Sequence, residues 1–371
     1  MEEKLVRVGI THGDINGIGY EVILKTFSDN RITELCTPVI YGSSKIAAFY
    51  RKMLELPSIS MNSILNAEEA GDNRVNIINC VNDEIKVEVG QPTPIAGEAA
   101  YKALERGVAD LKQGVIDVLL TAPINKNTIQ NDQFHFPGHT EYLEDQFSPQ
   151  GKKGLMILMN DQLKVALVTG HIPLSQVVSS ITVDDIVNKL SVFNQALKQD
   201  FRINKPRIAV LSINPHAGDG GLLGDEENAV LIPAMQEAEK KGVMSFGPYA
   251  ADGFFGSRMY ERFDGVLAMY HDQGLAPFKA LSMENGVNYT AGLPIIRTSP
   301  AHGTAYDIAG QNIASEESFR QALYTAIDVY RNRLRFKEAT AHPLRKQYFD
   351  KGSDNEKLDL TKDEDVDTFE P

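Results

Sequence analysis

The chain has 371 residues, of which 42% are hydrophobic and 23% charged, and its formal net charge is −13 at pH 7. This balance is that of an ordinary globular protein, and the length suits two α/β lobes better than one simple core. No basic face stands out, which argues against nucleic acid as a partner, and no apolar run approaches the roughly 20 residues that span a bilayer.

Short β-branched runs alternate along the chain with amphipathic helical stretches. The predicted strands are 5–10, 115–120, 164–168, 207–213 and 265–269, and the predicted helices are 99–113, 183–199, 226–241 and 316–337. Because the strand runs are apolar almost throughout, they predict strands buried on both faces, as in a largely parallel sheet. Alternating strands and helices predict an α/β fold with helices on both faces of that sheet. The stretch 53–82 is polar and irregular, and no structure is predicted for it.

A glycine-rich loop follows the first predicted strand and opens a helix. It reads Thr11-His12-Gly13-Asp14-Ile15-Asn16-Gly17-Ile18-Gly19. Glycines allow tight turns and a close approach of the backbone to a ligand, and a helix start offers free N–H donors. The spacing is not GxGxxG, so the loop is not a dinucleotide fingerprint, and a plain strand-to-helix turn explains it equally well.

Three histidines follow three separate predicted strands, namely His171, His216 and His271. Ligands of open α/β sheets bind in the crevice beyond the carboxyl ends of the strands, so these side chains are expected to face one crevice. Three imidazoles suit a divalent metal with an open coordination position. The alternative is three hydrogen-bonded structural histidines, because the spacings match no short zinc motif.

Candidate anion-binding residues occur in two other places. Lys126, His139 and Thr140 follow the strand at 115–120, and Lys279, Asn288 and Arg297 are spread over 278–299. Lysine and arginine near an amide are the residue types that bind a phosphate or a carboxylate. Scattered surface charge is the alternative, and it is weakened by the apolar residues at 293–296, where an unpaired charge would be unfavourable.

The cysteines and the two ends of the chain narrow the class further. Cys36 and Cys80 are far apart and form no CxxC pair, which argues against a disulfide framework or a thiolate zinc site. The charged start, Met1-Glu2-Glu3-Lys4, is unlike a secretory signal, so a cytoplasmic location is expected. Nine acidic residues and three lysines lie from Asp350 to Pro371, a net charge of −6 (3 − 9), and 346–371 is predicted to be an acidic, disordered tail.

Six motifs in this order resemble one family, the PdxA family of 4-hydroxythreonine-4-phosphate dehydrogenases. They are Gly13-Asp14-x-x-Gly17-Ile18-Gly19, Thr121-Ala122-Pro123-x-x-Lys126, Phe136-Pro137-Gly138-His139-Thr140-Glu141, Asn214-Pro215-His216-Ala217-Gly218, Tyr270-His271-Asp272-Gln273-Gly274 and Gly292-Leu293-Pro294-x-x-Arg297-Thr298. The resemblance covers about residues 5 to 335. Each motif is short, but six in order are highly specific.

The resemblance implies a fold and an assembly. The expected architecture is two α/β/α lobes around a largely parallel sheet, like that of isocitrate and isopropylmalate dehydrogenases, which bind NAD without the glycine fingerprint. The active site would lie in the cleft between the lobes. Residues 1–135 with 305–345 are predicted to form the first lobe, and residues 136–304 the second. Family members are homodimers that share the active site, with one metal-binding histidine coming from the neighbouring chain.

The same resemblance implies roles for individual residues. The metal ligands would be His171, His216 and His271, and the substrate-binding residues His139, Thr140, Lys279, Asn288 and Arg297. Asp252 and Asp272 lie in family motifs near the site and are given catalytic or supporting roles. No residue is assigned to the cofactor. The chain departs from the usual family pattern at Ile15-Asn16, Gly170 and Leu222, which leaves the substrate preference open.

The implied reaction is the NAD-dependent oxidation of 4-phosphooxy-L-threonine, assisted by a divalent metal. Zinc is the first choice of metal, with magnesium or cobalt as alternatives, and NADP is the alternative to NAD. The product, 2-amino-3-oxo-4-phosphooxybutanoate, would decarboxylate to 3-amino-2-oxopropyl phosphate in the biosynthesis of pyridoxine and pyridoxal 5′-phosphate. Two rival interpretations remain: a sibling dehydrogenase of threonate or erythronate 4-phosphate, and a metal-dependent phosphohydrolase.

Overall fold

A single twelve-stranded sheet organises the molecule, with the strand order β3-β4-β2-β1-β5-β12-β11-β6-β7-β10-β8-β9. The computed structural model describes residues 4–82, 84–148, 153–282 and 284–341, so the predicted tail at 346–371 lies outside the described residues. Within those ranges, none of the helices is both long and apolar enough to cross a membrane.

The first half of the sheet is parallel throughout. Its strands, in spatial order, are β3 (Met61–Ile64), β4 (Val75–Asn79), β2 (Cys36–Gly42), β1 (Val6–Thr11), β5 (Val118–Thr121) and β12 (Arg297–Pro300). Every residue of β2, β5 and β12 is buried, as expected for strands covered on both faces.

The second half is parallel as well, but it runs in the opposite direction. Its strands are β7 (Lys164–Leu167), β10 (Gly265–Ala268), β8 (Ile208–Leu211) and β9 (Ser245–Tyr249). Between the halves lie β11 (Val287–Ala291) and β6 (Leu155–Met159), and the pairs β12–β11, β11–β6 and β6–β7 are antiparallel. Three successive reversals put the carboxyl ends of the two halves at opposite edges, so a site that uses both halves has to lie over the central strands.

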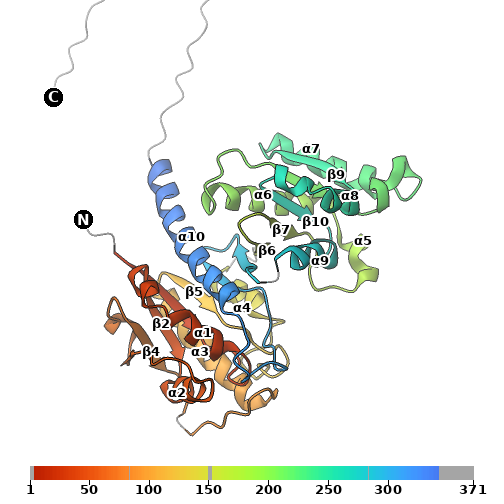
Figure 1. The fold of residues 1–371 in the computed structure, drawn as a ribbon. Coiled ribbons are helices and arrows are strands. Elements are labelled where there is room, and N and C mark those ends of the chain that lie inside the picture. The colour runs from red at the N-terminus through yellow and green to blue at the C-terminus, as the bar shows by residue number, and fades with distance from the viewer. Residues whose placement is uncertain (1–3, 83, 149–152, 283, 342–371) are drawn as a thin grey trace, which may run out of the picture.

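Helices cover both faces of the sheet, and separate clusters of buried side chains lie beneath them (Figure 1). The helices that pack with the first half of the sheet are α1 (Gly19–Phe27), α2 (Ser44–Met53), α3 (Pro94–Lys112) and α10 (Glu317–Ala341). The other helices are α4 (His139–Phe147), α5 (Val177–Ser180), α6 (Val183–Gln199), α7 (Ile232–Lys240), α8 (Ala251–Gly256) and α9 (His271–Ser282). Two of the longest helices begin at a capping threonine: Thr93 accepts from the Ala96 N–H and Thr182 from the Asp185 N–H.

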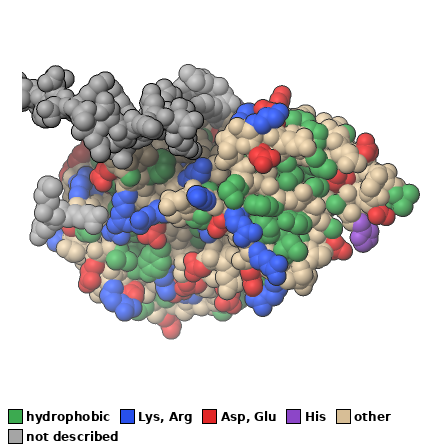
Figure 2. Space-filling model, turned by 90° about the horizontal axis from the view of Figure 1, so that it is seen from above, with side chains coloured by type: hydrophobic (Ala, Val, Ile, Leu, Met, Phe, Trp, Pro, Cys, Tyr) green, Lys and Arg blue, Asp and Glu red, His purple; other side chains and the backbone are tan. Residues whose placement is uncertain are grey.

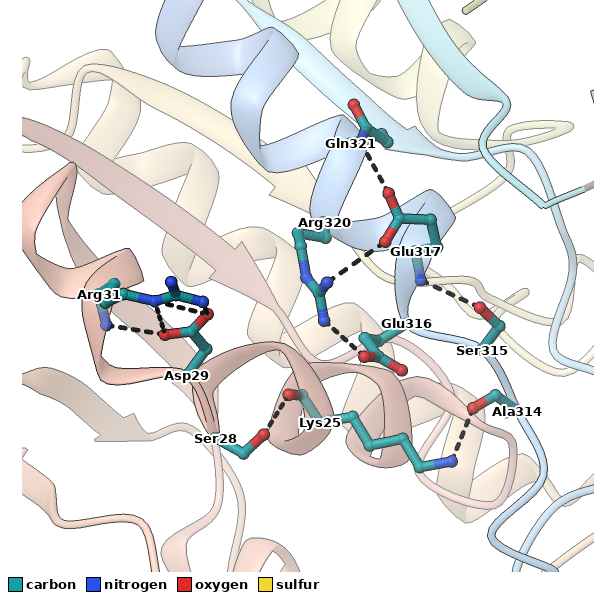
Figure 3. A network of polar contacts seen from close by, with 10 residues as sticks. All are labelled: Lys25, Ser28, Asp29, Arg31, Ala314, Ser315, Glu316, Glu317, Arg320 and Gln321. Atoms are coloured by element: carbon teal, nitrogen blue, oxygen red, sulfur yellow. Dashed lines mark hydrogen bonds and ion pairs between the residues drawn. The ribbon is translucent and has the colours of Figure 1, made fainter.

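Side chains of α1 hold the segment between β12 and α10 in place (Figure 3). The Lys25 ammonium donates to the Ala314 carbonyl at 2.7 Å and forms an ion pair with Glu21 at 2.8 Å. The buried Glu21 carboxylate also accepts from the Ala314 N–H at 2.9 Å. Glu317 lies in the first turn of α10, where a carboxylate complements the helix dipole. These contacts fix the end of a long segment that also carries His302.

The predicted class is confirmed, since the chain is α/β with a mostly parallel sheet. The predicted strands correspond to β1, β5, β7, β8 and β10, and the predicted helices to α3, α6, α7 with the preceding π-helical turn Glu227–Leu231, and α10. The stretch 53–82 does have structure, because β3 and β4 lie in it. Asn76 of β4 is buried, and its side-chain amide donates to the Pro38 and Gly71 carbonyls. This buried polar residue interrupts the apolar run by which the other strands were predicted. The division into lobes at 135/136 and 304/305 stays a prediction.

Candidate functional site

A cavity of about 600 Å³ lies over the central strands, between α4 from one side and α9 from the other. Met156, Leu158, Asn288 and Ser299 line its floor. Seven of the predicted site residues line it: His139, Thr140, His171, His271, Lys279, Asn288 and Arg297. The structure therefore brings together residues from both parallel halves at the antiparallel centre of the sheet.

Arg297, the first residue of β12, is the most deeply buried cation of this cavity, with 3% of its surface exposed. Its Nε and Nη2 donate to Thr121 Oγ1 at 3.0 and 2.7 Å, and Nη2 also donates to His139 Nδ1 at 3.2 Å. Burial lowers the pKa of Arg297 to about 10, although nearby Glu141 opposes this shift. The guanidinium is thus charged at neutral pH and short of a matching anion, as a binding site for phosphate or carboxylate requires.

His139, the first residue of α4, takes its protonation state from Arg297. A guanidinium can only donate, so the Nδ1 that contacts it has to accept, and the ring proton of a neutral His139 sits on Nε2. Burial lowers the pKa of His139 well below its usual value, and the charges of Arg297 and Lys126 add to the effect. Nε2 is buried and has no hydrogen-bond partner among the residues that the structure describes. His139 therefore supplies an unused N–H donor to the cavity.

The cavity is cationic although the chain is acidic. Five cations line it, Lys126, Lys153, Lys189, Lys279 and Arg297, against two carboxylates, Glu141 and Glu144. Burial raises the pKa of Glu144, although the hydrogen bond that its Oε1 accepts from the Gly154 N–H at 2.6 Å opposes this shift. Asn288 adds a buried side-chain oxygen to which no described residue donates a hydrogen bond. The balance favours a ligand with more than one negative group.

His171 and His271 face each other across the mouth of the cavity, with ring centroids 5.3 Å apart. Burial lowers the pKa of His171, helped by the charge of Lys126 and by His271, so its ring is neutral with a free lone pair. The Asp272 carboxylate accepts from His271 Nδ1 at 2.7 Å, so that nitrogen carries a proton and only the other ring nitrogen of His271 can bind a metal. A carboxylate that orients an imidazole in this way is typical of metal-binding histidines.

His216 and Asp252 lie away from this cavity. His216 is exposed in the segment Pro215–Gly221, whose backbone turns through left-handed conformations from His216 to Gly220. Asp252 is exposed at the start of α8. Across the described part of the chain, no group of three or more His, Cys, Asp or Glu is placed to hold a metal. The expectation that all three histidines face one crevice of the same chain is therefore not met, because the loop after β8 leads outward.

The glycines of the loop 11–19 allow close packing against other segments of the protein rather than close approach to a ligand. A Cβ on Gly13 would lie 2.3 Å from the Pro123 carbonyl oxygen, and a Cβ on Gly17 would lie 2.7 Å from that of Thr304. The Asp14 N–H donates to Pro123 at 2.8 Å, and Tyr306 donates its hydroxyl proton to the Asp14 carboxylate at 2.7 Å. The loop thus sets the place of two segments that line the cavity.

His302 lines the cavity too, although no sequence pattern predicts a role for it. Its Nδ1 donates to the Gly303 carbonyl at 3.0 Å, and its buried Nε2 has no partner within the described part of the chain. Burial lowers the pKa of His302, so Nε2 is an acceptor. No sequence pattern predicts a site role for Thr121 or Lys189 by itself; only the pairing of β5 with β12 and the packing of α6 bring them to the site.

Comparison with known proteins defines the class. The chain is 62% identical over 366 residues to the 4-hydroxythreonine-4-phosphate dehydrogenase of Bacteroides thetaiotaomicron, an alignment that covers 98% of this chain and 100% of that protein. It is 38% identical to a protein of Oceanobacillus iheyensis named "Putative D-threonate 4-phosphate dehydrogenase", over 87% of this chain and 97% of that one. By relationship the chain is an enzyme, a dehydrogenase.

The family follows from two further comparisons. The model of the family described as "Pyridoxal phosphate biosynthetic protein PdxA" matches residues 34–326. The crystal structure of 4-hydroxythreonine-4-phosphate dehydrogenase from Klebsiella pneumoniae superposes with a TM-score of 0.78 at 33% identity and covers 89% of this chain and 99% of that one. The chain belongs to the PdxA family, as its six motifs predicted. An oxidoreductase of pyridoxine biosynthesis is therefore the class to which the cavity has to be matched.

Proposed function

We propose that this protein oxidises 4-phosphooxy-L-threonine with NAD and a divalent metal. The hydroxyl-bearing carbon gives up a hydride and the hydroxyl a proton. The resulting 2-amino-3-oxo-4-phosphooxybutanoate, a β-keto acid, then loses carbon dioxide to give 3-amino-2-oxopropyl phosphate. We propose a cytoplasmic location for this step of pyridoxal 5′-phosphate biosynthesis.

One observation carries the proposal. A buried cation with an open donor beside it, Arg297 with His139, shares a cavity with two adjacent imidazoles, His171 and His271. The substrate has a phosphate and a carboxylate at its two ends and a hydroxyl between them. We assign one anionic end to Arg297, His139, Thr140 and Asn288, and expect Lys279, in the last turn of α9, to neutralise further charge.

The cavity contains two of the three proposed metal ligands. His171 and His271 both offer a lone pair, and Asp272 fixes the second ring. Two imidazoles leave coordination positions to fill, and we propose His216 of a second copy as the third ligand. When bound, the metal would polarise the substrate hydroxyl and NAD would accept the hydride. Zinc suits imidazole ligands best, with cobalt or magnesium as alternatives.

A homodimer with shared sites accounts for the residues that lie outside the cavity. His216 and Asp252 follow the adjacent parallel strands β8 and β9, so both leave the sheet at the same edge. The segment after His216 exposes Leu222 and Leu223, at 79% and 44% of their surface. On the face drawn in Figure 2, hydrophobic side chains likewise reach the surface among lysines and arginines. Contact with a second copy would cover such apolar side chains and bring His216 and Asp252 to its cavity.

The side chains of this chain prepare the reaction in three ways. Neutral His139 and charged Arg297 bind an anionic end without a proton change, since burial already holds His139 uncharged. Asp272 keeps the proton of His271 on Nδ1, which leaves the other nitrogen free. We propose that Asp252 of a second copy and Asp272 receive the proton that leaves the hydroxyl.

The decisive experiment follows NADH absorbance with purified protein, NAD and 4-phosphooxy-L-threonine. We expect turnover that a chelator abolishes and that added zinc or cobalt restores. Replacing NAD with NADP measures the cofactor preference. Release of inorganic phosphate without NADH would contradict the proposal and point to the phosphohydrolase chemistry that relationship to dehydrogenases argues against.

A second substrate is supported by one comparison. The Oceanobacillus iheyensis relative is named for D-threonate 4-phosphate, which differs from 4-phosphooxy-L-threonine in bearing a hydroxyl where the latter bears an amino group. The same anion contacts and hydride transfer would serve both substrates. Measuring kcat/KM for the two under one set of conditions separates them, and a preference for threonate or erythronate 4-phosphate would replace the first assignment.

A further inference from the structure

A buried network around Arg333 of α10 lies behind the proposed anion site. Its Nε donates to the Asp200 carboxylate at 2.8 Å, and its Nη2 donates to the Tyr289 hydroxyl at 2.9 Å. Tyr289 in turn donates to the other oxygen of Asp200 at 2.6 Å. Tyr289 is fully buried and Asp200 is 2% exposed, so each charge and hydroxyl depends on the others for its hydrogen bonds.

The same guanidinium also holds the turn that leads into the site. Its Nη1 lies within hydrogen-bond distance of three successive carbonyls, those of Leu293, Pro294 and Ile295, at 3.3, 3.4 and 3.1 Å. Arg297 comes two residues after this turn, at the start of β12. The turn begins at Gly292, whose φ of +82° favours glycine. A turn of this shape cannot easily rearrange to make up for the loss of its contacts with Arg333.

The network reaches the other anion-binding strand through Tyr289. Neighbouring residues of a strand point to opposite faces, so Asn288 faces the cavity while Tyr289 faces Arg333 and Asp200. One guanidinium thus contacts both the residue next to Asn288 and the turn next to Arg297. No residue of this network lines the cavity itself.

We propose that Arg333, with Asp200 and Tyr289, is a positioning residue for anion binding: it fixes Asn288 and Arg297 in the geometry that receives the phosphate or carboxylate of the substrate. This inference rests on the proposed role of Arg297. Because α10 packs against β5 and β12 while Asp200 ends α6, the contact also ties the two halves of the sheet together at the cavity. Displacing a preorganised binding group weakens binding even when the group itself is intact.

The test measures binding of inorganic phosphate by calorimetry, together with steady-state kinetics. Arg333→Met keeps much of the side-chain volume and removes the guanidinium, whereas Tyr289→Phe removes one hydroxyl. We expect Arg333→Met to raise both the Kd of phosphate and the KM of the phosphorylated substrate roughly tenfold, and Tyr289→Phe about threefold, with little change in the KM of NAD. Arg335→Met, at an exposed position on the same helix, is the matched control and should behave as wild type.

Comparing the variants Arg297→Lys and Arg333→Met distinguishes a failure of the positioning role of Arg333 from a failure of the proposed anion site. If Arg333 acts through Arg297, the double variant binds phosphate less weakly than the product of the two single effects. Normal phosphate binding in Arg333→Met and Tyr289→Phe, with weak binding in Arg297→Lys, overturns the positioning role alone. Normal binding in Arg297→Lys overturns the proposed anion site as well. Should Arg333→Met fail to fold, Tyr289→Phe decides by itself.

Discussion

Arg297 donates to Nδ1 of His139, two residues that are 158 positions apart in the chain. The contact settles which nitrogen of His139 carries the proton and leaves Nε2–H as the donor that faces the ligand. Charge comes from the arginine and a directed neutral donor from the histidine, so the pair can bind an anion over a wide pH range.

Replacing His139 should show the value of that donor. We expect His139→Leu to lower kcat/KM for the phosphorylated substrate by about 10- to 100-fold, the range for losing a hydrogen bond to a charged group. His139→Gln keeps an amide N–H and should lie closer to wild type. Equal losses in the two variants would show that the side chain acts by packing rather than by donating.

The contact between Arg297 and His139 shows how much of the site can be predicted from the sequence. Periodicity predicted the strand that corresponds to β5, and the residue types of Lys279, Asn288 and Arg297 indicated an anion site. Periodicity could not show that β12 pairs with β5, since β11 and β12 are short and carry polar residues, and strand order depends on packing over the whole chain. The contacts of Arg297 with Thr121 and His139 follow only from that order. The same limit applies to His216, whose loop direction after β8 is set by left-handed residues rather than by any strand pattern.

Asp272 should govern metal affinity. Asp272→Asn removes the carboxylate that accepts from His271 Nδ1, so we expect the affinity for zinc to fall by about 10- to 100-fold. Competition with a chromophoric chelator measures this directly, and excess metal should restore much of the activity. Glu237→Gln, which disturbs an exposed ion pair with Lys240, serves as the control. Unchanged zinc affinity in Asp272→Asn would mean that the contact does not orient a metal ligand.

Mixing two inactive variants tests the shared site. His171→Ala and His216→Ala should each abolish activity, because each removes one proposed ligand. If His216 serves the cavity of a second copy, a mixed dimer keeps one intact site, and random mixing restores about a quarter of wild-type activity. Co-expression or unfolding and refolding together provides the mixture, and size-exclusion chromatography with light scattering checks the dimer. No recovery on mixing, with dimers present, would place all ligands on one chain or elsewhere.

Gly13 and Gly114 form a matched pair for testing how tightly the glycine-rich loop 11–19 packs against the 121–126 segment. Both have a φ of +70°, but a Cβ on Gly13 would lie 2.3 Å from the Pro123 carbonyl oxygen whereas one on Gly114 meets nothing within 4 Å. Gly114→Ala should therefore cost about 1 kcal/mol from its backbone conformation alone. Gly13→Ala should lower the free energy of unfolding by at least about 2 kcal/mol more, because backbone has to shift. Urea titration measures both. Similar losses would mean that the loop yields easily and does not fix the 121–126 segment.

His12 makes stability depend on pH in a direction that can be worked out. Its ring is fully buried, and this burial lowers its pKa to about 4 even though a hydrogen bond with the Ala99 carbonyl opposes the shift. Between pH 6.5 and 4 the unfolded chain therefore binds a proton that the native protein does not, so acidification favours unfolding in this window. From pH 7 to 5 we expect His12 to remove about 2 kcal/mol from the free energy of unfolding.

The variant His12→Gln isolates this contribution, since glutamine keeps a donor for Ala99 and does not titrate. Urea unfolding at pH 7, 6 and 5 should show wild type losing stability faster than the variant, so that the gap between them shifts by about 2 kcal/mol in favour of the variant at pH 5. Other buried histidines such as His139 titrate in both proteins and cancel in the difference. Parallel pH profiles for the two proteins would show that His12 gains its proton in the native state as readily as in the unfolded one, and therefore that water reaches its ring at the end of β1.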